Sequence, residues 1–141
     1  MKRFIILLFV LSTFTVYTQN SSIKWHKAFN NAIEQAYTEN KMVIMFFADE
    51  ESDKNKVVID NLINSEAFNT IKDKFVFAHI ERNSANTNTA MYNKRLTIHY
   101  NKSNSFPAVL VIEKNGAPKG QLQTEFTPEA IQTYLNFLKT L

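Results

Sequence analysis

The side chains best suited to chemistry gather in residues 49–55, directly after a hydrophobic run. Four carboxylates, Asp49, Glu50, Glu51 and Asp53, stand there around a serine. Carboxylate oxygens suit hard metal ions, but the stretch lacks the glycine and the distant bidentate glutamate of a calcium loop. We therefore interpret the cluster as a solvated turn near a helix N-terminus, where acids are favoured, and predict no metal site.

Ser52 carries the hydroxyl group of this stretch, and this hydroxyl would need a base and an oxyanion hole to act as a nucleophile. The three histidines, His26, His79 and His99, are expected on a helix, a strand and a loop edge, and no acyl-transfer motif surrounds them. Ser52 is instead interpreted as the N-cap of a helix that begins at Asp53. No catalytic residue and no cofactor are predicted.

The composition excludes two classes of function. No cysteine occurs in the 141 residues, so the chain has no thiol for redox chemistry, disulfides or thiolate metal sites. The net charge of +3 includes Lys2 and Arg3, and without these two residues 14 basic side chains face 13 acidic ones. Such a balance gives no electrostatic support for binding nucleic acid.

Residues 1–19 have the layout of a cleaved secretory signal peptide. Two basic residues precede the apolar run Phe4–Leu11, which is too short to span a bilayer as a stable helix. We expect cleavage near Thr18 or Gln19, export to the periplasm or outside the cell, and one domain over residues 20–141 with no stable membrane insertion. An uncleaved membrane anchor is the alternative.

The rest of the chain alternates between helical and strand patterns. The expected elements are a helix over Trp25–Tyr37, a strand over Met42–Phe47, helices from Asp53 and after Ser65, a strand over Phe75–Glu81, a helix over Thr89–Leu96, strands over Phe106–Glu113 and Gly120–Phe126, and a helix after Thr127. Crossover helices make the early strands parallel, and Asn115-Gly116 predicts a hairpin between the last two. The prediction is an α/β fold with a mixed central sheet and helices on both faces.

Three stretches resemble secreted bacterial thioredoxin-like domains of the thioredoxin-7 type. They are Trp25, Ala32, Ala36 and Lys41 before the first long strand, Leu62–Phe68 with Lys74–Val76, and Ser105–Ile112. The resemblance covers the chain from Trp25 onward and implies a thioredoxin-like fold. It also implies that Pro107 is the family's cis-proline.

By the family's spacing, the Cys-x-x-Cys motif falls on Ser52-Asp53-Lys54-Asn55. Neither a serine nor an asparagine forms the thiolate that disulfide exchange requires. The resemblance further implies that Phe106 and Pro107 form a backbone edge beside this turn, where relatives hold an extended substrate by main-chain hydrogen bonds. The alternative interpretation of Pro107 is a proline that merely starts a strand, and the resemblance favours the cis-proline.

The leading interpretation is an exported, redox-inactive thioredoxin-fold module that binds a peptide or protein, or acts like a chaperone. One alternative is an enzyme of the same superfamily with non-cysteine chemistry, for example glutathione-dependent chemistry. Another is a non-catalytic subunit of a disulfide-exchange system. Whether the chain is an enzyme stays open at this point.

Overall fold

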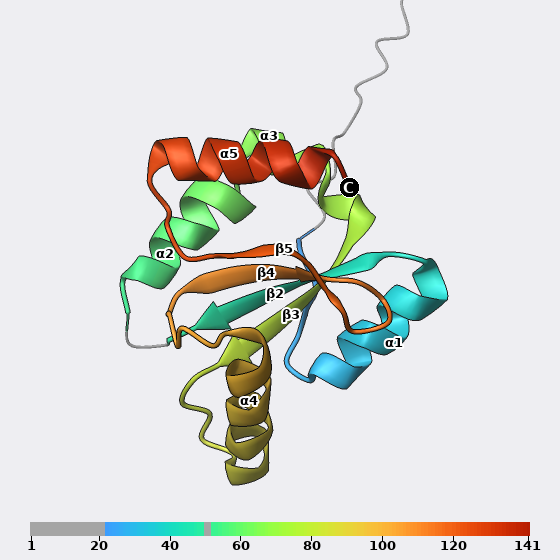
Figure 1. Cartoon of the computed structure of the whole chain (residues 1–141), viewed down its shortest axis with the longest axis vertical. Coiled ribbons are helices and arrows are strands. Elements are labelled where there is room, and N and C mark those ends of the chain that lie inside the picture. The colour runs from blue at the N-terminus through green and yellow to red at the C-terminus, as the bar shows by residue number, and fades with distance from the viewer. Residues whose placement is uncertain (1–21, 50–51) are drawn as a thin grey trace, which may run out of the picture.

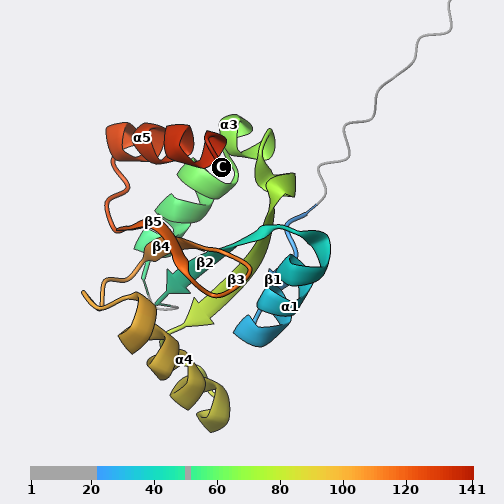
Figure 2. The same ribbon diagram turned by 45° about the vertical axis from the view of Figure 1, so that its right-hand side comes forward.

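The computed structural model describes residues 22–49 and 52–141, which form a five-stranded mixed sheet with helices on both faces (Figures 1 and 2). The strands are β1 (Trp25–His26), β2 (Met42–Ala48), β3 (Phe75–Glu81), β4 (Ala108–Ile112) and β5 (Pro118–Gln123). The helices are α1 (Phe29–Glu39), α2 (Lys54–Val58), the π-helical η1 (Ile59–Ile63), α3 (Glu66–Asn69), the 3-10 turn η2 (Lys72–Lys74), α4 (Thr87–Tyr100) and α5 (Pro128–Lys139). The predicted α/β architecture is confirmed.

Strand β2 lies at the centre of the sheet, whose order is β1-β3-β2-β4-β5. It pairs in parallel with β3, from Met42 opposite Phe75 to Ala48 opposite Glu81, and antiparallel with β4. Neighbours on both edges and helices on both faces bury every residue of β2 after Met42. This explains why the strand reads as a continuous apolar run instead of an alternating one.

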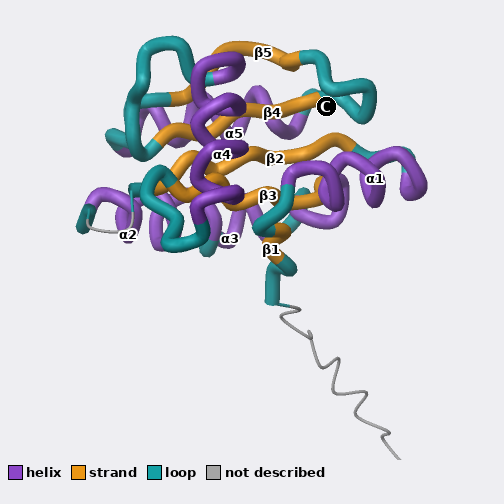
Figure 3. The backbone as a smooth tube through the Cα atoms, turned by 90° about the horizontal axis from the view of Figure 1, so that it is seen from below, coloured by secondary structure: helices purple, strands orange, loops and turns teal. Residues whose placement is uncertain are grey.

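Alternate side chains of β2 enter two separate cores. Ile44 and Phe46 belong to the core under α2, α3 and α5, whereas Val43 and Met45 belong to the core under α1 and α4. Figure 1 shows α2, α3 and α5 on one side of the sheet and α1 and α4 on the other, and the view from below shows the strands side by side in their order (Figure 3). The sheet thus fixes the position of the loop that follows β2.

The helices predicted after Ser65 and Thr127 are both present, and each of these two residues caps its helix. The Ser65 hydroxyl accepts a hydrogen bond from the Phe68 N–H at 3.1 Å and starts α3. The Thr127 hydroxyl accepts one from the Ala130 N–H at 3.2 Å, with proline as the first residue of α5. Both caps satisfy backbone donors that a helix start leaves unpaired.

The prediction that Trp25 and His26 lie on the first helix is wrong, because they form the short strand β1. Trp25 lies opposite Phe77 of β3, and its ring contacts that of Phe77 at a centroid distance of 5.4 Å. Helical spacing placed Trp25 on the same face as Ala32 and Ala36, but its ring packs against the core on the opposite side of the sheet. Helix α1 starts only at Phe29.

The prediction for α4 was too short, and His99 lies inside this helix instead of at a loop edge. The Asn86 side chain accepts a hydrogen bond from the Thr89 N–H at 3.0 Å and starts the helix. Met91 and Ile98 are exposed, so the apolar pattern that sequence reading relies on is weak here.

The bounds of the final hairpin were also shifted in the prediction. Strand β4 is shorter than predicted at both ends, and β5 begins and ends earlier. The Asn-Gly turn between them is present, with Gly116 at φ +87°. Across the described residues, no helix is long and apolar enough to cross a membrane. The predicted signal peptide lies outside the described residues.

Candidate functional site

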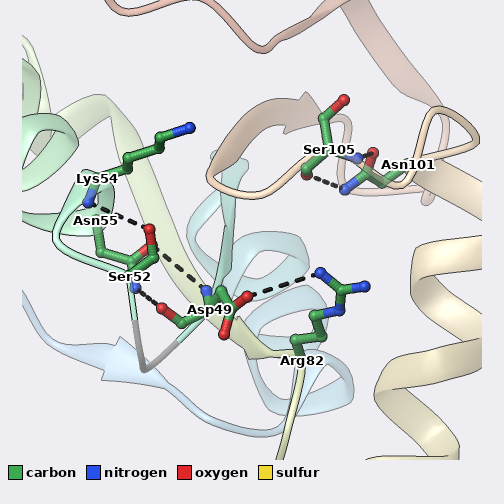
Figure 4. Close-up of polar contacts among 7 residues, drawn as sticks. All are labelled: Asp49, Ser52, Lys54, Asn55, Arg82, Asn101 and Ser105. Carbon is green, nitrogen blue, oxygen red and sulfur yellow. Dashed lines mark hydrogen bonds and ion pairs between the residues drawn. The ribbon is translucent and has the colours of Figure 1, made fainter.

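The turn after β2 is held together by the side chain of Asn55 (Figure 4). The Asn55 Nδ2 donates to the carbonyl of Asp49, and the Asp49 N–H donates to the Asn55 Oδ1 at 3.4 Å. The Ser52 N–H also donates to the Asp49 carbonyl, at 2.9 Å. The amide thus bridges the end of the strand to the first turn of α2, and this is a structural task.

Ser52 bonds the start of the helix, although the helix begins at Lys54 and not at Asp53 as predicted. Its hydroxyl oxygen accepts a hydrogen bond from the Lys54 N–H at 3.2 Å. The Asp53 side chain makes no capping bond. In the part of the chain that the structure describes, Ser52 has no hydrogen bond to a histidine or to a carboxylate side chain, so nothing there activates its hydroxyl as a nucleophile.

The acidic cluster does not assemble into a metal site within the described residues. No three histidine, aspartate or glutamate side chains in residues 22–49 and 52–141 come close enough together to hold a metal ion. Asp49 instead pairs with Arg82, whose Nη1 lies 3.6 Å from the Asp49 Oδ2. Glu50 and Glu51, the two middle acids of the cluster, lie outside the described residues.

The loop before β4 carries the Phe106–Pro107 peptide bond, which is cis. The side chain of Asn101, only 1% exposed, holds this loop from the end of α4. Its Nδ2 donates to the Ser105 carbonyl at 2.6 Å, and its Oδ1 accepts from the Ser105 N–H at 3.0 Å (Figure 4). Both backbone groups of Ser105 are therefore satisfied by one buried amide.

Phe106 joins this loop to the turn after β2. Its ring lies edge-on to that of Phe47 at a centroid distance of 6.3 Å, and the Arg82 guanidinium lies 4.9 Å from its centroid. Since Arg82 also pairs with Asp49, the aromatic ring, the cation and the carboxylate form one connected row. A cation over an aromatic face is attracted by the ring's negative quadrupole.

A groove of about 370 Å³ lies between α2, this loop and the segment after β5. It is lined by Lys54, Val57, Ser105, Phe106, Pro107, Thr124 and Phe126. Of the predicted site residues, Lys54, Phe106 and Pro107 meet in the groove, whereas Ser52, Asp53 and Asn55 do not line it. Phe106 forms part of the wall and leaves the groove open.

Two features of the groove bear on what it can hold. The N–H and C=O of Phe106 have no hydrogen-bond partner among the described residues, and Lys54 has no ion pair there either. The groove therefore offers one free backbone donor, one free acceptor and a positive charge beside apolar side chains. Sequence reading did not find Val57, Thr124 and Phe126 as residues of the groove. Val57 belongs to the apolar pattern of its helix, and only the structure shows that it is 40% exposed.

The chain matches a family model described as thioredoxin-like, of the thioredoxin-7 type, over residues 24–114. It belongs to the thioredoxin-like family. The match ends after β4, and the structure shows that β5 and α5 complete the fold. No curated protein matches the chain in sequence.

Solved structures agree with this assignment. A structure titled DsbH oxidoreductase superposes with a TM-score of 0.69 at 17% identity, covering 86% of this chain and 87% of that one. A thioredoxin from Thermus thermophilus gives 0.65 at 16%, covering 84% and 86%. A disulphide isomerase from Xylella fastidiosa Temecula1 gives 0.61 at 11%, covering 79% and 88%. Such identities establish the shared fold alone.

This thioredoxin-like chain has no cysteine at all. Dithiol–disulfide exchange requires a thiolate to attack sulfur, so the chain's own side chains cannot perform it. The fold predicted from the resemblance is confirmed, and the module is redox-inactive in that sense.

Proposed function

We propose that this protein is an exported, thioredoxin-fold binding module that holds an extended segment of a protein partner in the groove beside Phe106 and Pro107. One observation carries the proposal: the backbone N–H and C=O of Phe106 are unpaired among the described residues and lie at an open groove. An extended peptide can pair with such an edge through its own main chain, and its side chains then enter the flanking hollow.

The walls of the groove favour a peptide over a small charged metabolite. Val57, Phe126 and the Phe106 ring supply apolar surface, and Lys54 is the single cation among the lining residues. The volume of about 370 Å³ lies at the lower end of what ligand pockets offer, so it suits a short stretch of side chains. A chaperone-like role fits the same groove, because main-chain bonding tolerates many sequences.

Export is part of the proposal and rests on the sequence of residues 1–19, with its two basic residues and short apolar run. In an oxidising compartment a thioredoxin-fold protein without cysteine forms no mixed disulfide with its partners. Partners would then bind and leave reversibly, at rates set by the groove alone.

Site-specific photo-crosslinking tests the proposal. A benzoylphenylalanine replaces Phe106 in the full-length chain, and a matched variant carries it at Tyr37, which is 71% exposed on α1, away from the groove. We expect defined crosslinks to exported proteins from position 106, which an excess of an extended peptide from the captured protein competes away. Equal labelling from both positions would refute the groove as the binding surface.

A second measurement separates binding from catalysis. Insulin reduction and glutathione transfer are assayed with the purified chain and with glutathione present. We expect no turnover above that of the buffer. Clear turnover in either assay would overturn the binding module and favour an enzyme that activates a bound thiol.

A further inference from the structure

A second and larger cavity, of about 720 Å³, lies at the edge of the sheet where β1 has ended. It is bounded by the start of α1, the end of β3, the loop that follows β3, and α4. Both helices lie on the same side of the sheet (Figure 1). None of the residues that line the groove beside Pro107 lines this cavity, so the two are separate sites.

Asn93 of α4 lines this cavity and carries an unsatisfied acceptor. The residue lines the cavity, is only 2% exposed, and donates from Nδ2 to the Glu81 carbonyl at 3.1 Å. That bond fixes the orientation of the amide, because a carbonyl oxygen accepts only from the NH2 end. The Asn93 Oδ1 is left with no partner among the described residues, which is uncommon for a buried polar atom.

Glu81, the last residue of β3, adds a carboxylate in the same place. Its side chain is 15% exposed, and the cations nearest to it are loosely placed. The Lys27 Nζ lies 3.7 Å from Oε1, and the His79 Nδ1 lies 3.5 Å from it. Both distances exceed those of a normal hydrogen bond. The carboxylate therefore has electrostatic neighbours, but among the described residues no side chain donates a close hydrogen bond to it.

His79 does not supply the missing positive charge. Burial lowers the pKa of its imidazole, an effect that exceeds the opposing influence of Glu81, so the ring is neutral near pH 7. Lys27 is 81% exposed and sits at the rim, where it can turn into solvent. The charged and titratable side chains that line the cavity are these two, Glu81 and Tyr92, whose hydroxyl donates a hydrogen bond to the Asn30 Oδ1 at 2.6 Å.

We propose that this cavity binds an organic cation through a primary ammonium group, which donates hydrogen bonds to the Glu81 carboxylate and the Asn93 Oδ1. An ammonium group carries three hydrogen-bond donors and one positive charge. The donors match the Asn93 Oδ1, which has no donor of its own, and the charge matches the Glu81 carboxylate, which has no close cation. An anion would meet repulsion from the same two groups. The group belongs either to a free amine or to a lysine side chain of a peptide.

Titration followed by two-dimensional NMR of the full-length protein tests this site. Butylamine represents the free amine, acetyl-lysine amide represents the side chain, and 1-pentanol is the uncharged control of similar size. We expect saturable shifts of the Asn93 side-chain amide and the Glu81 backbone amide with one or both amines, at roughly millimolar dissociation constants. Binding of the lysine derivative alone would identify a peptide as the source.

Two variants check the roles of the charges. Glu81→Gln keeps the shape and should weaken amine binding by about tenfold or more, whereas Glu113→Gln, which alters a carboxylate outside the cavity, should leave it unchanged. Lys27→Ala removes the competing cation and should tighten binding by about threefold. Equal shifts with 1-pentanol, full binding by Glu81→Gln, or no saturable shift with either amine would overturn the site.

Discussion

Replacing Asn101 with alanine tests how the loop that carries Phe106 and Pro107 is held. The buried amide of Asn101 accepts a hydrogen bond from the Ser105 N–H and donates one to the Ser105 carbonyl. Asn101→Ala removes both bonds at once and leaves both backbone groups without a partner. Because these are the only bonds found for the Ser105 backbone among the described residues, the loop loses its tie to α4.

The cost follows from the two bonds. Each neutral hydrogen bond contributes about 1 kcal/mol, and an unpaired buried group adds a desolvation cost of about 1–3 kcal/mol. Ser105 is half-buried, so water can reach part of its backbone and reduce that added cost. We expect the free energy of unfolding to fall by about 2–3 kcal/mol, which corresponds to a decrease in Tm of roughly 6–12 °C.

Urea unfolding followed by circular dichroism measures this loss. Asn115→Ala is the matched control, because its side chain accepts a single bond from the Ala117 N–H at 2.9 Å in an exposed turn. That change should cost no more than about 1 kcal/mol. If Asn101→Ala costs no more than the control, water replaces the buried amide and the loop does not depend on it. Asn101→Ala should also weaken crosslinking from position 106.

Three further changes have expected outcomes. Gly120→Ala places a Cβ 2.5 Å from the ring of Phe137 at φ +79°, so urea unfolding should show a loss of about 2–3 kcal/mol. Gly116→Ala has a similar φ, and its Cβ would meet only an ordinary contact with the Tyr100 hydroxyl at 3.6 Å, so it should cost about 1–2 kcal/mol. Ser65→Ala removes the cap of α3 and should cost about 1 kcal/mol by the same measurement. Burial lowers the pKa of His79 below the ordinary value of 6.5. As the pH falls from 6.5 toward that lowered pKa, the unfolded chain therefore takes up a proton before the folded chain does, and the free energy of unfolding should fall. His79→Gln should flatten the plot of unfolding free energy against pH below 6.5. An unchanged plot would contradict the lowered pKa of His79.

The sheet was predictable because its central strands carry strong patterns. The apolar run from Met42 and the aromatic run from Phe75 to Glu81 each give an element whose type is unmistakable, and both are strands. Caps such as Ser65 and Thr127 were predictable for a local reason, since the bond that they make spans only three residues. Local hydrogen bonds and burial within the sheet therefore made most of the fold predictable from the sequence.

The features that the sequence missed depend on contacts between distant segments. The strand of Trp25 and His26 exists because an edge of β3 is available to pair with it. The row from Asp49 through Arg82 to Phe106 joins three loops, and no spacing of residues in the sequence predicts it. The pairing of Asn93 with the Glu81 backbone joins α4 to the end of β3 in the same way. Such sites become visible only when the fold brings their members together.

The structure gives a physical reason for the presence of Ser52 and Asn55 in the turn after β2. The amide of Asn55 closes the turn onto both backbone groups of Asp49, and the hydroxyl of Ser52 bonds the first N–H of α2. Both side chains bond the backbone, and neither is a thiol. The turn is then held by side-chain hydrogen bonds, and it keeps Lys54 in place at one wall of the groove. An open groove beside a locked turn is the arrangement expected of a surface that binds without reacting.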